Sequence, residues 1–258
     1  MCLAIVALDV HPRYALVVAA NRDEYHARPT QSAHWWAAED DLEILAGRDL
    51  EAGGTWLGVT RSGRWAFVTN VRQGTARDLH APSRGSLVPR VLRDPRDPHS
   101  ALVAAIADAQ HYNGFNLMAG EIDCASWGSN RGEAGSALNR GVHGLSNARL
   151  DTPWPKLVRT KSGVAAWTEA GREDIDALLA LLADRERARD DELPSTGVSR
   201  EWERVLSAPF ITGENYGTRS STVLTISRDG EAHLVEQSFN ARGEPSGRVE
   251  HAFRLTTR

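Results

Sequence analysis

Short apolar runs separated by polar turns fill most of this chain, a pattern that is typical of β-strands. Residues 3–8 and 14–20 are apolar, and the turn-forming residues between them predict a hairpin. A second hairpin is predicted from 53–60 and 64–70, joined by Arg61-Ser62-Gly63. Further strands are predicted at 115–121, 124–128, 141–145, 219–227, 231–239 and 247–256.

Helical spacing is confined to the middle of the chain. Residues 84–93 and 99–110 repeat apolar side chains every three to four positions. A third helix is predicted to begin with Thr152 as its N-cap and Pro153 in its first turn, where the missing N–H costs nothing. A fourth is predicted at 173–188, because it opens with acidic residues and ends with arginines, which suits the helix dipole.

Hairpins and segregated helices together favour an α+β fold with antiparallel sheets rather than alternating β-α-β units. Residues 189–200 are polar and contain Pro and Gly, which predicts an exposed loop. We find no internal repeat and no linker, so residues 1–258 are interpreted as one domain. Within the second hairpin, Trp56 and Trp65 are expected to face each other across the strands.

Composition excludes several classes of protein. The formal net charge is −4 and we see no basic stripe, so a nucleic-acid partner is not expected. The apolar start of the chain is interrupted at Asp9 and is too short for a secretory signal or a membrane span, so a cytoplasmic protein is expected. Cys2 and Cys124 are too few for a disulfide framework, and the nine histidines lack metal-ligand spacing. No cofactor and no metal are therefore expected.

The position of Cys2, directly after Met1, suggests that its thiol acts as a nucleophile. Removal of Met1 would leave a thiol and a free α-amine on one residue, with ordinary pKa values of about 8.5 and about 7.7–8.0, so that the amine can take the thiol proton. Such a nucleophile needs a cation, a carboxylate and donors for an oxyanion. Candidates for these roles at the ends of predicted strands are Arg22, Asp23, Asn70, Asn147 and Arg219.

Simpler interpretations compete with this one. A lone cysteine in an apolar strand is more often inert packing. The segment 144–148 nearly matches the G-x-S-x-G elbow, but that motif requires a parallel sheet. Trp35 and Trp36 could line a pocket and His143 could ligate haem, although such residues are more often structural.

Several motifs across the chain resemble the NRDE family, also called the transport and Golgi organisation protein 2 family. The resemblance covers nearly the whole chain and is carried by Met1-Cys2 and by the segments at 21–24, 28–30, 45–50, 53–58, 112–117, 128–132, 143–148 and 216–220. That family in turn resembles N-terminal-nucleophile (Ntn) hydrolases of the bile-salt hydrolase and penicillin V acylase kind. The resemblance implies a four-layer αββα sandwich of two antiparallel sheets.

By the same resemblance, Cys2 matches the nucleophile of those hydrolases, and Asn147 and Arg219 match their late active-site Asn and Arg. Asn70 is a candidate oxyanion-hole residue. In those amidases two other residues separate the early Arg and Asp, whereas Arg22 and Asp23 are adjacent, which leaves open whether both reach the site.

Two functions are consistent with these residues. The first is a hydrolase or acyltransferase that acts on a non-peptide C–N amide bond of a small-molecule substrate. The alternative is a non-catalytic protein that binds or carries acyl-CoA, another lipid-like ligand or haem. The resemblance implies this alternative, because members of the NRDE family are associated with the handling of such ligands. Neither the substrate nor the oligomeric state can be read from the sequence.

Overall fold

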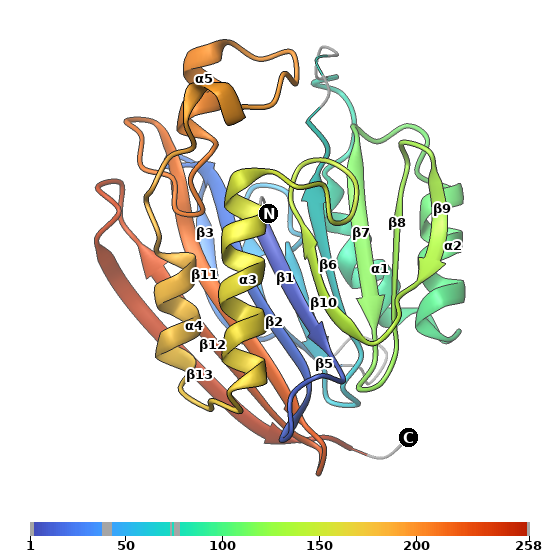
Figure 1. The fold of residues 1–258 in the computed structure, drawn as a ribbon. Coiled ribbons are helices and arrows are strands. Elements are labelled where there is room, and N and C mark those ends of the chain that lie inside the picture. Colours follow the sequence, from blue (N-terminus) through green and yellow to red (C-terminus); the bar gives the residue numbers. More distant parts are fainter. Residues whose placement is uncertain (1–2, 38–42, 73, 75–77, 257–258) are drawn as a thin grey trace.

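Two antiparallel sheets form the centre of the protein in the computed structural model, which describes residues 3–37, 43–72, 74 and 78–256 (Figure 1). The six-stranded sheet has the order β10 (Gly141–Leu145), β1 (Leu3–Leu8), β2 (Tyr14–Tyr25), β11 (Tyr216–Ser227), β12 (Glu231–Phe239) and β13 (Pro245–Arg254). The seven-stranded sheet has the order β3 (Thr30–Trp35), β4 (Ile44–Asp49), β5 (Leu57–Thr60), β6 (Trp65–Asn70), β7 (Phe115–Gly120), β8 (Ala125–Ser129) and β9 (Glu133–Ala137).

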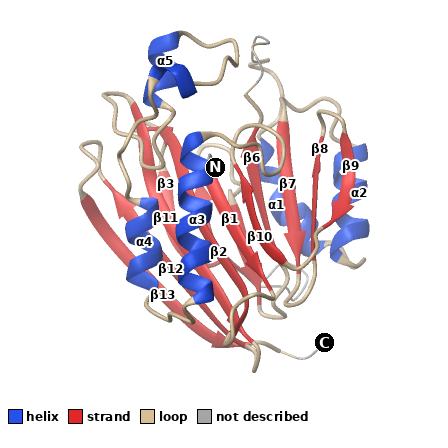
Figure 2. Cartoon of the chain, viewed as in Figure 1, coloured by secondary structure: helices blue, strands red, loops and turns tan. Residues whose placement is uncertain are grey.

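Helices cover the outer face of each sheet (Figure 2). The α-helices are α1 (Leu87–Arg93), α2 (Pro98–Ala107), α3 (Pro155–Glu169), α4 (Ile175–Leu182) and α5 (Arg200–Val205), and the short 3-10 turns are η1 (Arg84–Ser86) and η2 (Asp190–Glu192). Helices α1 and α2 pack on the seven-stranded sheet, and α3 and α4 pack on the six-stranded sheet. The result is the expected four-layer αββα sandwich.

Alternation along the strands builds this layering, because successive side chains point to opposite faces of a sheet. On β1, Ala4, Val6 and Leu8 lie in the core between the two sheets. Leu3 and Ile5 on the same strand pack under α3 and α4 instead. A strand that is buried on both faces reads as one continuous apolar run, which is why β1 is the clearest strand in the sequence.

Strand β2 is longer than expected. The predicted strand ends at Ala20, whereas β2 continues through the polar residues that follow and ends at Tyr25. The strand continues because β11 pairs with it as far as Tyr216 opposite Tyr25. Strands β3, β4 and β9 were not predicted at all.

Two helix predictions are also wrong in their bounds. Helix α3 begins at Pro155, with Trp154 as its N-cap, whereas Thr152 donates its hydroxyl to the Arg149 carbonyl in the preceding turn. Helix α4 ends at Leu182 rather than at 188. The predicted exposed loop at 189–200 contains η2 and ends where α5 begins.

The two tryptophans of the second hairpin do not form a cross-strand pair. Trp65 lies opposite Val59, and its ring stacks on Phe67 with centroids 6.1 Å apart. Trp56 precedes β5. Both rings are nevertheless buried in the core between the sheets.

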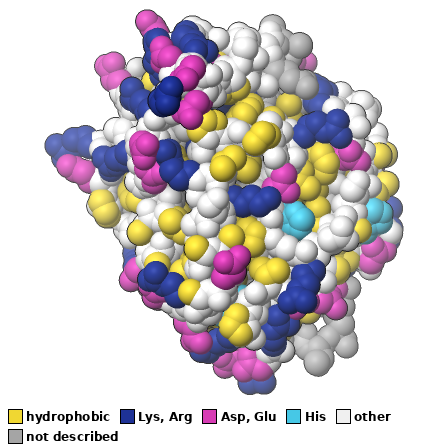
Figure 3. All heavy atoms as spheres, viewed as in Figure 1, with side chains coloured by type: hydrophobic (Ala, Val, Ile, Leu, Met, Phe, Trp, Pro, Cys, Tyr) yellow, Lys and Arg dark blue, Asp and Glu magenta, His cyan; other side chains and the backbone are white. Residues whose placement is uncertain are grey.

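The surface mixes both signs of charge. Basic and acidic side chains are interspersed over the face that includes α3 and α4 (Figure 3). Among the described residues, no helix has the length and apolar character needed to cross a membrane.

Candidate functional site

A polar cleft of about 880 Å³ lies at the end of the sandwich where β1 begins. We call it the main cleft. It is lined by the ends of β2 and β6, by the turn after β10 and by the start of β11. The predicted site residues that line it are Arg22, Asp23, Asn70 and Asn147.

Arg22 and Asp23 both line the main cleft although they are adjacent on β2. Their side chains leave the strand on opposite faces, because alternation requires it. Arg22 lies on the face between the sheets, with its guanidinium 4.4 Å from the ring centroid of Trp56 and its Nη1 donating to Thr30 Oγ1 at 3.1 Å. Burial lowers the pKa of the Arg22 guanidinium, and its effect outweighs the negative charges of Glu24 and Asp49, which raise that pKa.

On the opposite face of β2 from Arg22, the Asp23 side chain is hydrogen-bonded to a residue of β11. Thr218 Oγ1 donates to Asp23 Oδ1 at 2.7 Å, and the same Oγ1 accepts the Ile211 backbone N–H at 2.8 Å. Asp23 and Thr218 are both buried. The carboxylate is therefore held in one orientation by a short relay of hydrogen bonds.

Asn147 and Asn70 meet across the two sheets. Asn147 Nδ2 donates to the Asn70 carbonyl at 2.9 Å, and Asn147 accepts from Arg72 through both its side chain and its backbone. Asn147 is buried, and the Asn70 amide has no hydrogen-bond partner among the described residues. Asn70 and Asn147 both line the main cleft.

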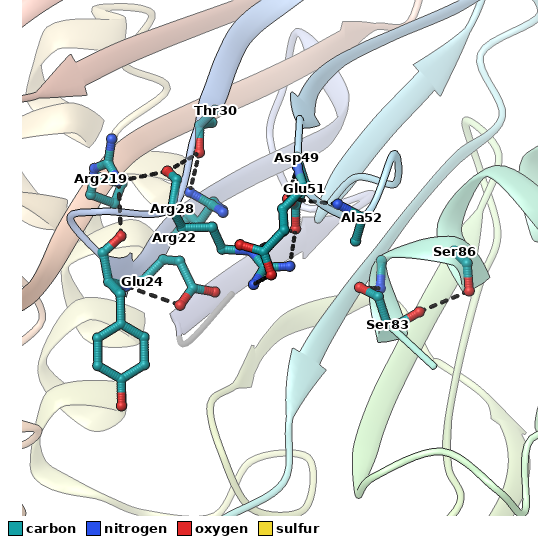
Figure 4. Close-up of polar contacts among 12 residues, drawn as sticks. Arg22, Glu24, Arg28, Thr30, Asp49, Glu51, Ala52, Ser83, Ser86 and Arg219 are labelled. Carbon is teal, nitrogen blue, oxygen red and sulfur yellow. Dashed lines mark hydrogen bonds and ion pairs between the residues drawn. The ribbon is translucent and has the colours of Figure 1, made fainter. Parts of the chain in front are cut away.

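Arg219 lies elsewhere. A β-bulge in β11 falls between Thr218 and Ser220, and such a bulge redirects the extra side chain. Arg219 Nη1 donates to the carbonyls of Tyr25, His26 and Arg28, in the turn between β2 and β3 (Figure 4). Arg219 therefore lines a second hollow of about 240 Å³, beside the buried Glu236, and does not line the main cleft.

Cys2 lies outside the described residues. The strand that follows it is described from Leu3, which pairs with Asn21, the neighbour of Arg22 on β2. The other cysteine, Cys124, is exposed and has no disulfide, and the pKa of its thiol is raised, mainly by burial of the sulfur.

The cleft also contains charged residues to which the sequence analysis assigned no role. Arg28 bridges Asp49 and Glu51 at 2.8 and 2.9 Å. Arg72 pairs with the buried Glu203 at 2.8 Å. Arg28 and Asp49 fall inside segments quoted for the family resemblance, which was a usable signal. Glu203 lies on α5, where no pattern predicted a helix.

His143 contacts groups of neighbouring turns. His143 Nε2 contacts the Asn139 carbonyl at 2.8 Å, and Nδ1 lies 3.4 Å from Asp151. Within the described part of the chain, no group of three His, Cys, Asp or Glu side chains could hold a metal ion. The segment 144–148 follows a strand of an antiparallel sheet, which is not the setting of a nucleophile elbow.

The family profile described as "Transport and Golgi organisation 2" matches residues 1–241. The chain belongs to this family. It is 36% identical to the transport and Golgi organization protein 2 homolog of Bos taurus over 99% of both chains. It is 34% identical to the Homo sapiens homolog over 93% of both chains. These names describe a cellular process and define no reaction.

The fold resembles solved structures of Ntn hydrolases. Penicillin V acylase from Agrobacterium tumefaciens is 11% identical, with a TM-score of 0.55 over 92% of this chain and 83% of that one. The mutant C2A conjugated bile acid hydrolase from Clostridium perfringens is 10% identical, with a TM-score of 0.55 over 99% of this chain and 92% of that one. At these identities the likeness establishes the sandwich fold that this member of the transport and Golgi organisation 2 family adopts.

Proposed function

We propose that this protein is an N-terminal cysteine hydrolase of non-peptide amide bonds, with Cys2 as its nucleophile. The observation that carries the proposal is the pairing of Leu3 with Asn21. This pairing brings the start of β1 to the end of β2 that lines the main cleft. The proposal requires Cys2, the residue before β1, to meet Arg22 and Asp23.

The fold supports this assignment. One structure with the same sandwich fold is the mutant C2A of a conjugated bile acid hydrolase, in which alanine replaces a cysteine at the second position of that protein. The present chain has a cysteine at the same position. Bile acid conjugates and penicillin V are amides, which suggests an amide bond as the substrate here too.

The reaction follows from the two groups on a processed Cys2. The α-amine takes the thiol proton, and the thiolate attacks the amide carbon, forming a C–S bond and an oxyanion. The oxyanion collapses, the C–N bond breaks, and the leaving amine receives the proton from the α-ammonium group. Water then loses a proton to the α-amine as it attacks the thioester, and the C–S bond breaks to release the acid and restore the thiol.

The surrounding residues take the supporting roles. The buried Asp23 carboxylate orients the α-ammonium group and favours its charged form. Arg22 stabilises the thiolate. The amide of Asn70, together with Asn147, donates to the oxyanion, and each such donor contributes about 3–4 kcal/mol where it has been measured elsewhere. Arg219 is a positioning residue that holds the turn after β2.

The test uses the two cysteines as each other's control. Mass spectrometry of the purified protein should show Met1 removed, and an electrophilic amide probe at pH 7 should label Cys2. A screen of acyl amides should give turnover with wild type and with Cys124→Ala but not with Cys2→Ala. Cys124 is exposed and its thiol pKa is raised, so it reports background labelling.

Two outcomes would reject the hydrolase. Retention of Met1 in the active preparation removes the α-amine that the mechanism needs. Equal turnover by wild type and Cys2→Ala excludes the nucleophile. If Cys2→Ala instead binds acylated ligands as tightly as wild type and neither hydrolyses them, the protein is a carrier that uses the same cleft.

A further inference from the structure

Helix α5 is tied to the main cleft by a buried carboxylate. The helix lies beyond the ends of the strands, apart from α3 and α4 (Figure 1). Glu203, a buried residue of this helix, accepts at Oε2 from Arg72 Nη1 at 2.8 Å. Its Oε1 accepts from the Thr196 N–H at 2.9 Å and from the Thr196 hydroxyl at 2.6 Å. Both carboxylate oxygens are therefore bonded, and the side chain is held in one orientation.

The loop before α5 also touches the loop that carries Arg72. Gly197 has a φ of +89°, and a Cβ atom built on it would lie 2.3 Å from the Cα atom of Gly74. A Cβ atom on Gly74 would lie 2.9 Å from the Cα atom of Gly197. Backbones this close leave no room for a side chain at either position. Packing of these two loops keeps α5 next to Arg72.

Arg72 uses the two ends of its guanidinium group for two different partners. Nη1 pairs with Glu203, and Nη2 donates to Asn147 Oδ1 at 3.3 Å. The Arg72 backbone N–H also donates to the Asn147 carbonyl at 2.7 Å, and the guanidinium lies 5.0 Å from the ring centroid of Trp154. The ion pair, the ring and the backbone contact together fix the position of the arginine.

These contacts decide which way the Asn147 amide faces. A guanidinium group only donates, so it requires the amide oxygen, whereas a backbone carbonyl only accepts, so it requires the amide nitrogen. Asn147 meets both requirements, because Oδ1 accepts from Arg72 and Nδ2 donates to the Asn70 carbonyl at 2.9 Å. Turning the amide over would set two donors against each other at Arg72 and two acceptors at Asn70. The second N–H of Nδ2 is the donor that the proposed mechanism assigns to the oxyanion.

Stability alone is a poor explanation for the pair of Arg72 and Glu203. Their side chains are only 13% and 3% exposed, so both charges have lost most of their water. Removing two charges from water costs about as much as their attraction returns, and apolar residues of similar volume often serve as well. The orientation that the pair imposes on Asn147 is the better explanation.

We propose that Arg72 and Glu203 are positioning residues that orient the Asn147 amide as an oxyanion donor. The role of that amide in catalysis rests on the proposed function, but its orientation does not depend on it. Glu203 is not among the described residues that line the cleft, so it acts through Arg72.

The orientation is tested by NMR on the ¹⁵N-labelled protein, which needs no substrate. The side-chain N–H signals of Asn147 are assigned by their loss in Asn147→Ala. Glu203→Gln and Arg72→Lys should each speed the exchange of these protons with water by about tenfold or more, because the contacts that hold the amide are weakened. Glu121→Gln is the matched control and should leave the exchange unchanged. Glu121 pairs with the buried Arg64 at 3.2 Å, and neither is among the described residues that line the cleft.

The effect on catalysis is tested with the chromogenic amide N-hexanoyl-p-nitroaniline. In Glu203→Gln, kcat should fall by about tenfold and KM should change by less than about twofold, because the oxyanion exists only after attack on the carbonyl. Arg72→Lys should show the same fall, since an ammonium group cannot contact Glu203 and Asn147 as the two ends of a guanidinium group do. Glu121→Gln should keep the kcat of wild type.

A double-variant cycle shows whether Glu203 acts through Asn147. The Asn147→Ala protein has no amide to orient, so adding Glu203→Gln should lower its kcat no further. Losses that multiply would overturn the proposal. So would an unchanged exchange rate of the Asn147 amide in both Glu203→Gln and Arg72→Lys, or the same acceleration in Glu121→Gln.

The positioning role and the hydrolase can fail separately. Faster exchange of the Asn147 amide in a protein that shows no turnover dependent on Cys2 would reject only the hydrolase. Turnover that depends on Cys2 but has the same kcat in Glu203→Gln as in wild type would reject only the positioning role.

Discussion

Thr218 Oγ1 donates a 2.7 Å hydrogen bond to Asp23 Oδ1 while it accepts the Ile211 N–H, and this arrangement fixes the orientation of the Asp23 carboxylate. Thr218→Val keeps the shape of the side chain but leaves Asp23 Oδ1 without this donor and the Ile211 N–H without its acceptor. Because both partners are buried, we expect a loss of about 1–3 kcal/mol in the free energy of unfolding, measured in urea. Thr218→Ser, which retains the hydroxyl, should lose much less. Equal losses would show that the relay contributes nothing.

Asp23→Asn tests the proposed role of the charge itself. The amide has nearly the same shape and can still accept from Thr218, so the free energy of unfolding should change little. If the carboxylate orients the α-amine of Cys2, turnover of an acyl amide should fall by about 100-fold or more, a typical contribution of acid–base catalysis. A variant that keeps full turnover would remove Asp23 from the mechanism.

Arg22→Gln should make the Cys2 thiol less reactive. Loss of the nearby cation raises the pKa of a thiol, so alkylation by iodoacetamide at pH 7 should slow by about three- to tenfold. Cys124 in the same molecule gives an internal rate for comparison. Arg48→Gln is the matched control, since Arg48 also lies over a tryptophan ring, 4.7 Å from the centroid of Trp36. The same slowing in both variants would point to a general loosening of the protein.

The sequence predicted the strands whose apolar residues are contiguous. Strand β1 has the predicted bounds, because all six of its residues are buried and apolar. Strand β10 also has the predicted bounds, although it is an edge strand and three of its five residues are half-buried. Strands β3 and β9 lie at the edges of the seven-stranded sheet and are mostly half-buried or exposed. Edge strands need no apolar alternation, so they carried no signal.

The sequence predicted the site residues whose position depends on where a strand ends. It did not predict those whose position depends on how two strands pair. Asn70 and Asn147 each follow an apolar run, and the structure brings them together. The direction of Arg219 is set by a bulge between its neighbours, which depends on pairing with β2 rather than on local sequence. Arg22 and Asp23 both line the cleft, because this end of β2 borders the cleft with both of its faces.

Glu236 should make stability depend on pH. It is buried, and burial raises the pKa of its carboxyl above the ordinary value of 4.5, although Arg22 and the Ala33 N–H oppose this. Where the folded state still holds a proton that the unfolded state has lost, stability falls as pH rises. The loss therefore begins near pH 4.5 and is complete above the raised pKa of the folded state.

Glu236→Gln removes this cost, since the amide can still accept from Ala33. We expect a gain on the order of 1 kcal/mol at pH 7 and none at pH 4, from urea unfolding at a series of pH values. Glu231→Gln, an exposed carboxyl on the same strand, is the control and should leave the profile unchanged. A gain that is the same at pH 4 and pH 7 would contradict the assignment to ionisation.

The contact between Gly54 and Gly85 joins the turn after β4 to η1, which carries Arg84. A Cβ atom on Gly54 would lie 2.4 Å from the carbonyl carbon of Gly85, and the Gly85 oxygen accepts the Thr55 N–H at 3.1 Å. Gly54→Ala must therefore push two backbones apart. We expect a loss of about 2–4 kcal/mol in the free energy of unfolding, as for other steric changes in packed regions.

Gly53→Ala separates this contact from ordinary strain in the turn. Gly53 has a φ of +74° and open space around it, so alanine costs only the strain of that conformation, about 1 kcal/mol. The loss in Gly53→Ala should therefore be the smaller of the two when both variants are unfolded in urea. Equal losses would show that the contact between Gly54 and Gly85 adds nothing beyond the strain of the turn.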